Sequence, residues 1–402
     1  MKILMVNKFL YPRGGSESYM LYLGEHLTKQ GHEVEYFGMY DEQNTVGNSA
    51  GQYTQNMDFH STGLARFLYP FKILYSFEAK KKIIQVIDAF KPDVVHMNNI
   101  NFQLTPSIID GIKKKGVPLV QTVHDYQMIC PNHLLYNFEK NTPCEKCLHG
   151  SYWHCVKNKC IHGSTVKSAL GVLEALLYTV LKPYKTVDLF VCPSTFLEHK
   201  LLATRSYYQG KTKTIHNFIN KNKFTNINPK TGSYIAFVGR LSKEKGVENL
   251  AKTAKLLPNY TFAVAGSGPD EAVLQDIPNI RLEGFLTGER LLEFLGNAKV
   301  LLLPSVCYEN CPLSILEAHC MGIPVVTMNS GGMAELVQNG VTGTLVDDPT
   351  PEGIACKLQE TLGNDAYYHA LCEGCSQAKD AILSVETYAD ILLKEYEKLV
   401  TR

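Results

Sequence analysis

Long hydrophobic runs are missing from the 402-residue chain. A helix that spans a bilayer needs about 18 or more consecutive apolar residues, and the nearest approach, residues 169–181, is shorter and contains Glu174. The first residues, MKILMVNKFLYPRGG, soon reach Lys8 and Arg13 and contain no small-residue cleavage motif, so they do not resemble a secretory leader. The sequence therefore predicts a cytoplasmic protein.

A large excess of charge of one sign is also missing. Lys and Arg number 40 against 39 Asp and Glu, and the single tryptophan, Trp153, has no stacking pattern of aromatic and basic residues around it, so a nucleic-acid partner is not expected. The balance hides an asymmetry, because residues 1–219 carry 24 basic against 17 acidic residues while residues 220–402 carry 16 against 22. An anionic ligand or membrane surface would suit the basic half, and unevenly distributed solvated charges are the alternative.

Short apolar runs alternate with helical stretches along nearly the whole chain, which is typical of parallel sheets covered by helices on both faces. In the first half the expected strands are 2–7, 33–39, 93–97, 119–124 and 187–192. The pattern lapses at residues 220–233, NKNKFTNINPKTGS, and then restarts with strands expected at 234–238, 261–265, 299–303 and 323–327. The final amphipathic helix is expected at 385–400.

We therefore predict an α/β protein with two doubly wound, Rossmann-like domains that face each other across a cleft. The predicted N-terminal domain covers 1–219 and carries a cysteine-rich insertion at 126–165; the linker covers 220–233, and the second domain 234–382. Residues 383–402 are expected to pack back on the first domain. Ligands of such sheets bind at the carboxyl ends of the strands.

Two motifs follow predicted strands of the second domain. GRLSKEKG places Arg240 and Lys245 in a loop that opens a helix, where two cations suit a phosphate or diphosphate, although alone they could be ordinary surface charges. PSVCYENCPLSILEAHC places Glu309 before a helix opened by Pro312, and Glu317 inside that helix. The backbone N–H groups at the start of that helix are expected to meet an anion.

Together these motifs resemble the retaining glycosyltransferases of family 4, which have the GT-B fold. The resemblance rests on G-R-L-x3-K-G, on Glu-x7-Glu, and on three further motifs in the family's order: Gly14-Gly15-Ser16-Glu17, His124-Asp125 and Ser330-Gly331-Gly332. The joint pattern extends over most of the chain and is specific, although each piece alone is weak.

The resemblance implies a role for each matching residue. Gly14 and Gly15 would let the backbone approach the donor diphosphate, whose charge Arg240 and Lys245 would neutralise as it leaves. His124 would lie beside the reacting sugar, in a catalytic role shared with Glu309, which would hold hydroxyls of the transferred sugar. The remaining residues implied in binding the donor sugar and ribose are Asn310, Cys311, Leu313 and Glu317.

No Asp-x-Asp sequence, the usual way to hold a divalent metal against a nucleotide diphosphate, occurs in the chain. We therefore expect catalysis without a metal or other cofactor. A nicotinamide-dependent enzyme is a weaker alternative, because Glu271 stands where the dinucleotide fingerprint after residues 261–265 needs Gly or Ala. A phosphate loop at Gly210-Lys211-Thr212 is discarded because position 205 is Arg205 rather than glycine.

Cysteines gather between residues 130 and 160. The spacing Cys144-x2-Cys147, followed by Cys155 and Cys160, predicts a structural zinc site, with disulfides, an iron–sulfur cluster or reduced thiols as alternatives. Catalysis would not require this metal.

Two stretches, 67–87 and 168–184, combine apolar residues with lysines and could lie on a membrane, although helices packed on a sheet look similar. The sequence as a whole predicts a nucleotide-sugar-dependent hexosyl- or N-acetylhexosaminyltransferase. Its acceptor would be a glycan or lipid-linked glycan, in capsule, O-antigen or exopolysaccharide biosynthesis at the inner face of the membrane. The alternatives are a nucleotide-sugar epimerase or hydrolase on the same fold, and a non-catalytic metal-binding scaffold.

Overall fold

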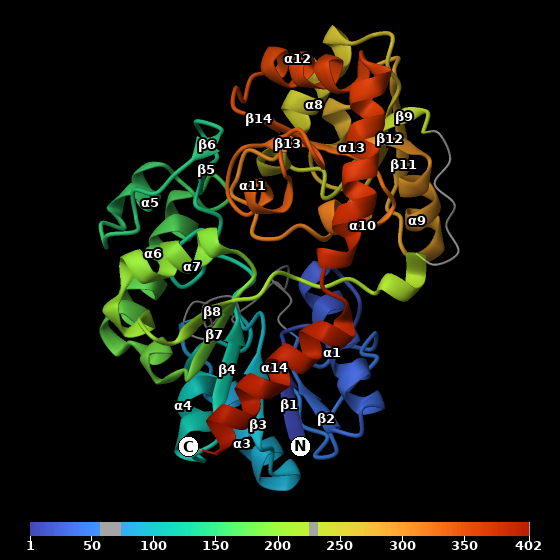
Figure 1. Ribbon diagram of the computed structural model, residues 1–402. Coiled ribbons are helices and arrows are strands. Elements are labelled where there is room, and N and C mark those ends of the chain that lie inside the picture. The colour runs from blue at the N-terminus through green and yellow to red at the C-terminus, as the bar shows by residue number, and fades with distance from the viewer. Residues whose placement is uncertain (57–73, 225–231, 402) are drawn as a thin grey trace. The chain divides into compact units, whose positions relative to one another are not determined.

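Two six-stranded sheets organise the protein in this computed structural model, which describes residues 1–56, 74–224 and 232–401 (Figure 1). The chain divides into two compact units. The first comprises Met1–Leu134, Lys146–Asn217 and Val385–Arg402, and the second Leu135–Glu145 and Phe218–Ser384. Both sheets are parallel and covered by helices, so the predicted fold class of two α/β domains is confirmed.

The sheet of the first unit has the strand order β2-β1-β3-β4-β7-β8. Its strands are β1 Lys2–Val6, β2 Glu33–Phe37, β3 Val94–Met97, β4 Leu119–Thr122, β7 Leu189–Cys192 and β8 Thr212–Thr214. Strands β3, β4 and β7 are buried along their whole length, as expected of central parallel strands that have helices on both faces.

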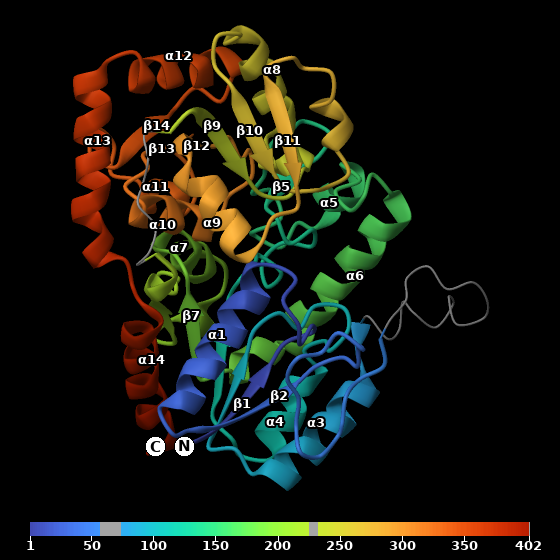
Figure 2. The same ribbon diagram turned by 90° about the vertical axis from the view of Figure 1, so that its right-hand side faces the viewer.

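Seven helices among the described residues belong to the first unit (Figure 2). They are α1 Gly15–Lys29, α3 Phe77–Phe90, α4 Ser107–Lys114, α5 Trp153–Lys157, α6 Thr165–Leu181, α7 Thr195–Thr204 and α14 Val385–Val400, with 3-10 turns η1 Pro183–Thr186 and η2 Ser206–Tyr208. Helix α14 packs against α1, where the hydroxyls of Tyr388 and Tyr19 lie 2.8 Å apart. The chain's last helix is therefore part of the unit that contains its first strand.

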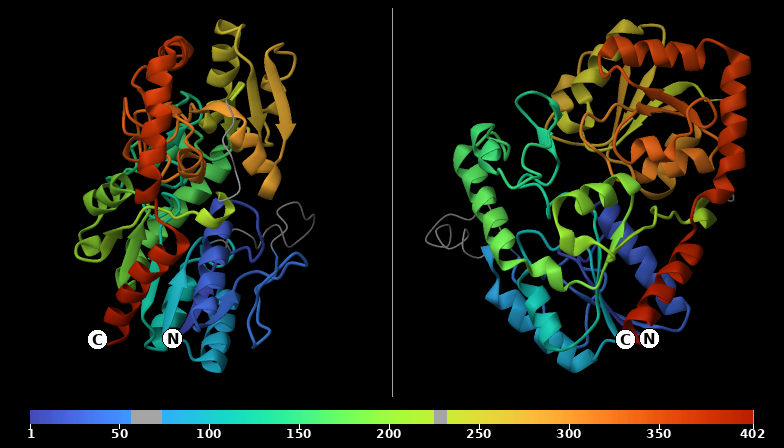
Figure 3. Two further views of the ribbon diagram at one scale, coloured as in Figure 1. Left: turned by 45° about the vertical axis from the view of Figure 1, so that its right-hand side comes forward. Right: turned by 60° about the vertical axis from the view of Figure 1, so that its left-hand side comes forward.

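The sheet of the second unit has the order β11-β10-β9-β12-β13-β14. Figure 3 shows its yellow and orange strands with helices around them. Its strands are β9 Tyr234–Val238, β10 Phe262–Ala265, β11 Ile280–Gly284, β12 Ala298–Leu303, β13 Val325–Met328 and β14 Gly343–Val346. The helices are α8 Val247–Leu256, α9 Gly288–Gly296, α10 Leu313–Cys320, α11 Met333–Leu336, α12 Pro351–Leu362 and α13 Asp365–Ala378, with 3-10 turns η3 Lys221–Phe224, η4 Lys243–Lys245, η5 Glu271–Val273 and η6 Lys379–Ala381. One apolar core joins the sheet to these helices.

The predicted strands lie where they were expected, with ends that differ by up to two residues. The edge strands β8, β11 and β14 are not among the predicted strands, because their short sequences, TKT, IRLEG and GTLV, lack a long continuous apolar run. The predicted linker 220–233 contains η3, and its residues 225–231 lie outside the described residues.

One part of the predicted insertion is in the other unit. Residues 135–145, which hold the hairpin β5 Tyr136–Asn137 and β6 Thr142–Pro143, group with the second unit rather than the first. In the three described ranges, no helix is both long enough and apolar enough to cross a membrane.

Candidate functional site

Four loops meet at the carboxyl edge of the second unit's sheet, after β9, β10, β12 and β13. The loop after β9 is tied to the loop after β10 by the bond from the Leu241 N–H to the Ser267 carbonyl, 3.0 Å long. The Glu244 carbonyl accepts the Val306 N–H at 2.9 Å and so ties the same loop to the one after β12. These strands are neighbours in the sheet, so the topology brings together motifs that lie far apart in sequence.

Two glycines make the close approach of these loops possible. Gly246 has φ +77°, and a Cβ at this position would lie 1.9 Å from the carbonyl oxygen of Pro304. Gly331 has φ +59°, and its Cβ would lie 2.8 Å from the carbonyl oxygen of Glu309. Both positions combine a left-handed backbone with a backbone neighbour that cannot move aside, so only glycine fits without strain.

Lys245 and Glu309, two residues predicted to act on the donor, form a hydrogen-bonded ion pair. The Ser305 hydroxyl donates to the same Glu309 oxygen at 2.9 Å, and the Glu309 carbonyl accepts the Gly332 N–H at 2.7 Å. Burial alone would lower the pKa of Lys245, but the charge of Glu309 outweighs it, and the pKa lies above its ordinary value. The structure thus brings a permanent cation and a fixed carboxylate together at the strand ends.

Arg240 and Glu317 flank this pair in sequence. Arg240 is exposed in the loop after β9, where its guanidinium can reach an anionic ligand. Glu317 is half-buried within α10, and burial raises the pKa of its carboxyl to about 7, partly opposed by the charge of Lys223. A carboxyl with this pKa is easily converted to the ionised form when a ligand supplies hydroxyl donors.

The start of α10 differs slightly from its prediction. Pro312 is the cap, one residue before the helix begins at Leu313. The Cys311 side chain is buried in a small apolar cluster with Ile219 and Leu316, against which Leu313 packs, so only the backbone of Cys311 could face a donor. Asn310 remains half-buried beside this helix start.

In the first unit, Gly14 and Gly15 stand at the beginning of α1. Gly14 caps the helix without a side-chain hydrogen bond, and Gly15 is the first residue of the helix. The N–H groups of the first turn are therefore arranged as they are in helix ends that bind anions. The Glu17 carboxylate is buried in this turn and accepts a hydrogen bond from the Asn7 side chain at 3.2 Å.

His124 follows β4 in the first unit and is held in one orientation. Its Nε2 lies 2.9 Å from Oδ1 of Asn98, and its ring meets the Tyr19 ring edge-on at 5.1 Å between centroids. Burial lowers the pKa of His124 to about 4, so the imidazole is neutral and donates its Nε2 hydrogen to the Asn98 oxygen. Asn98 was not singled out from the sequence, although it directly follows β3, the strand next to β4, and its position at the carboxyl end of that strand could have identified it.

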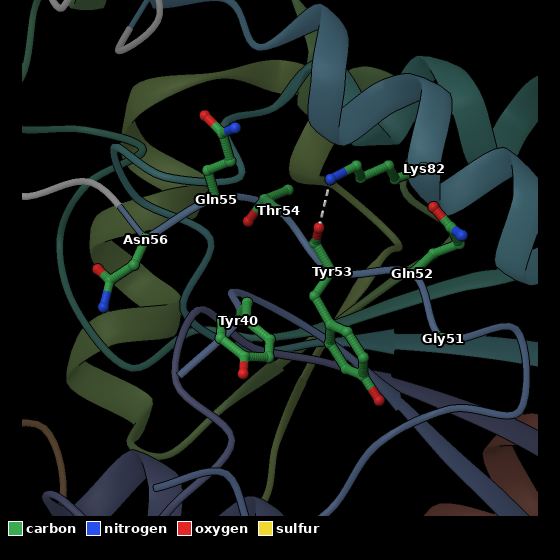
Figure 4. Close-up of a pocket in the computed structure, with 8 residues that line it drawn as sticks. All are labelled: Tyr40, Gly51, Gln52, Tyr53, Thr54, Gln55, Asn56 and Lys82. Carbon is green, nitrogen blue, oxygen red and sulfur yellow. Dashed lines mark hydrogen bonds between the residues drawn. The ribbon is translucent and has the colours of Figure 1, made fainter. Parts of the chain in front are cut away.

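A further feature of the first unit escaped the sequence analysis entirely. A pocket of about 510 Å³ lies beside the segment after β2 (Figure 4), lined by Tyr40, Gly51, Gln52, Tyr53, Thr54, Gln55, Asn56 and Lys82. Lys82 donates to the Tyr53 carbonyl at 2.6 Å and anchors one wall. Tyrosine and amide side chains in such a hollow are suited to sugar hydroxyls and rings.

Three of the four cysteines predicted as zinc ligands lie in one buried cluster. Cys147, Cys155 and Cys160 line one buried cluster of the first unit with Tyr152, whereas Cys144 belongs to the second unit and neighbours Tyr308. Across the part of the chain that the structure describes, no three His, Cys, Asp or Glu side chains are grouped so that they could hold a metal ion. The structural zinc site stays a prediction.

Comparisons with known proteins agree with this architecture. Residues 13–223 match the protein-family model described as Glycosyltransferase Family 4, and residues 218–378 match Glycosyl transferases group 1. A 42.6 kDa protein in the cps region of Klebsiella pneumoniae is 26% identical over 353 residues, which cover 84% of this chain and 87% of that protein. An uncharacterised glycosyltransferase of Methanocaldococcus jannaschii is 26% identical over 393 residues, 90% of each chain.

Solved structures share the fold at low sequence identity. Sucrose-phosphate synthase from Thermosynechococcus elongatus matches with a TM-score of 0.73 at 17% identity, covering 100% of this chain and 99% of that one. The Anabaena protein HepE in complex with UDP and glucose matches with a TM-score of 0.68 at 16% identity, covering 99% and 100%. The fold is that of the GT-B glycosyltransferases.

Proposed function

This chain belongs to glycosyltransferase family 4 and is a glycosyltransferase, and we propose that it transfers a sugar from a nucleotide-sugar donor with retention of the anomeric configuration. The observation that carries the donor assignment is the convergence of Lys245, Glu309 and the loop of Arg240 at one sheet edge. The two cations would stabilise the diphosphate as negative charge develops on it, without help from a metal ion. Glu317 would accept hydrogen bonds from the ribose.

The Lys245–Glu309 pair suits a site that must hold both a phosphate and a sugar. Glu309 fixes the ammonium before the donor binds, so little reorganisation is needed when charge appears on the leaving group. The Ser305 hydroxyl and the Gly332 N–H hold Glu309 itself, leaving a rigid carboxylate for sugar hydroxyls. His124, which is neutral, would contact the transferred sugar as a hydrogen-bonding group rather than as a charge.

The acceptor we propose is a glycan or lipid-linked glycan of a cell-surface polysaccharide. Support comes from the relative in the cps region of Klebsiella pneumoniae and from the pocket around Tyr40 and Tyr53, whose side chains can bind sugar. The cytoplasmic localisation expected from the sequence stays a prediction.

Donor binding is tested by the thermal stability of the protein in the presence of a panel of nucleotide sugars, each with and without EDTA. We expect one donor to raise the melting temperature equally in both conditions, and Arg240→Ala to abolish the rise while Arg290→Ala, an exposed arginine of α9, retains it. A rise that requires Mg²⁺ or Mn²⁺ would refute the metal-independent mechanism. No response to any donor would refute the donor assignment.

Product analysis separates transfer from the alternatives. A transferase releases the nucleoside diphosphate and places the sugar on an acceptor, and NMR of the new anomeric centre reports whether configuration is retained. Altered donor without an acceptor product would instead indicate an epimerase or hydrolase. An unchanged cellular glycan in a strain that carries Glu309→Ala would favour a scaffold.

A further inference from the structure

Helix α6 exposes five of its large apolar side chains. Val166 is 79% exposed, Leu173 52% and Val180 76%, and Leu176 and Leu181 are exposed as well. Val166, Leu173 and Val180 are seven residues apart, about two helical turns, so they form one stripe along the helix. In the described ranges, no other helix exposes more than one large apolar side chain.

The side of α6 that faces the protein contains small and polar residues, together with Val172 and Ala175, which pack partly buried against the cluster of Cys147, Cys155 and Cys160. Its fully buried residues are Ser168, Gly171 and Glu174. A Cβ on Gly171 would lie 2.4 Å from Cδ1 of Ile161, which shows how closely the chain approaches this face. A helix on a water-exposed surface normally does the opposite and buries its apolar stripe. The orientation of α6 therefore leaves an apolar face that water does not favour.

The charged residues that precede, form and follow α6 in the sequence are nearly all basic. Between residues 151 and 187 the chain has the five lysines Lys157, Lys159, Lys167, Lys182 and Lys185, all of them exposed. The only carboxyl in this range is Glu174, which is buried on the other side of the helix. Lys167 lies in the first turn of α6, and Lys182 follows its last residue, so cations stand at both ends of the stripe.

Helix α3, the other basic stretch named from the sequence, lacks this arrangement. Its apolar residues Ala79, Ile83, Val86, Ile87 and Phe90 are buried in the core, as in an ordinary amphipathic helix. Lys82 is engaged by Glu78 and by the Tyr53 carbonyl. The remainder of that stretch, residues 67–73, lies outside the described residues.

We propose that the exposed face of α6 docks on an anionic lipid bilayer, with the helix parallel to the surface, its stripe among the acyl chains and its lysines at the lipid phosphates. Aliphatic residues flanked by lysines are what an interfacial helix needs, because burial of apolar area and attraction to anionic headgroups add together. The complementary positive charge favours an anionic membrane over a second copy of this chain, whose α6 would present the same lysines. The proposal goes beyond sugar transfer, because docking requires neither donor nor acceptor.

Vesicle binding by the full chain tests the proposal. We expect the protein to co-sediment with vesicles of phosphatidylcholine and phosphatidylglycerol, and about tenfold or more weakly with phosphatidylcholine alone. The double variant Leu173→Glu/Val180→Glu should bind the anionic vesicles at least about tenfold more weakly. Its matched control is Leu256→Glu, an equally accessible leucine at the end of α8, which should bind as the wild type does.

Fluorescence then identifies the docking face directly. Trp153 is the only tryptophan, so Leu173→Trp in a Trp153→Phe background carries a single emitter on the stripe. Its emission should shift to the blue with anionic vesicles and be quenched by brominated lipids, whereas Leu256→Trp in the same background should not respond. The stripe positions Leu173 and Val180 and the control position Leu256 are all exposed. Circular dichroism checks that the variants fold.

Three results would overturn the proposal. The first is that the wild type fails to bind vesicles, and the second is that the double variant binds them as well as the wild type does. The third is that the double variant loses a concentration-dependent dimer and nothing else, which would make the stripe an interface between copies of the chain. Donor-induced thermal stabilisation of the double variant should equal that of the wild type, so a failure of docking and a failure of the proposed transferase are distinguishable.

Discussion

Donor binding should depend on pH through Glu317. The carboxyl of this residue is half-buried in α10, and burial raises its pKa to about 7 in the ligand-free protein. Ribose hydroxyls donate hydrogen bonds, so the ionised carboxylate is the form that binds the donor. At a pH below this pKa, a proton must leave Glu317 when the donor binds, so the affinity for the donor falls as the pH falls.

The size of the effect follows from the ionised fraction. With a pKa of about 7, about nine-tenths of Glu317 is ionised near pH 8 and about one-tenth near pH 6, so the dissociation constant should rise about tenfold between these values. His124 does not add to this slope, because its pKa of about 4 leaves it neutral throughout the range. Near pH 7 about half a proton should be released for each donor bound.

Isothermal titration calorimetry with the intact nucleotide sugar measures both quantities. The intact sugar is preferred to the free diphosphate, whose terminal phosphate titrates in the same range. Repeating the titration in two buffers with different ionisation enthalpies gives the number of protons released. Glu317→Gln should bind about tenfold more weakly near pH 8, through the loss of a charged hydrogen-bond acceptor, and should show no pH dependence. Glu352→Gln, an exposed carboxyl of α12, serves as the matched control.

Two outcomes would refute this reasoning. A Glu317→Gln variant that keeps the pH dependence of the wild type would show that another group titrates on donor binding. An affinity that stays constant from about pH 6 to about pH 8 would show that Glu317 is not ionised by the donor and does not bind the ribose.

Three further predictions concern stability and catalysis. Lys245→Met should lower the turnover number by about a hundredfold or more, because the substitution removes a cation that stabilises the leaving diphosphate. Lys243→Met, in the same 3-10 turn, should change the turnover number little, and steady-state kinetics measures both variants. Gly246→Ala should lower the free energy of unfolding in urea by about 2–4 kcal/mol, because its Cβ would overlap the Pro304 carbonyl and its φ is positive; an unchanged midpoint would contradict this. Burial raises the pKa of Glu174 to about 8, so the wild type should lose stability as the pH rises from about 5 through about 8. Glu174→Gln should therefore be more stable than the wild type by a few kcal/mol in alkaline buffer and by much less near pH 5. Parallel pH profiles of the melting temperature for the two proteins would rule this out.

The sequence by itself determined the two sheets and the donor motifs. Central parallel strands are buried on both faces, so their sequences are continuous apolar runs, as in residues 189–192 and 262–265. Motifs that follow such runs must lie at the carboxyl edge of a sheet, which is why Arg240 and Glu309 could be assigned to one site before the fold was known. Half-buried edge strands such as β8 carry no such run and were missed.

Tertiary structure decided which side chains touch. The pairing of Lys245 with Glu309 and the support of His124 by Asn98 depend on contacts between residues far apart in the chain, which local spacing does not encode. The same holds for α6. Its composition predicts an amphipathic helix, but the segments that pack on the helix determine which of its faces is buried. In α6 the buried face contains Gly171 and Glu174, whereas Leu173 and Leu176 are exposed.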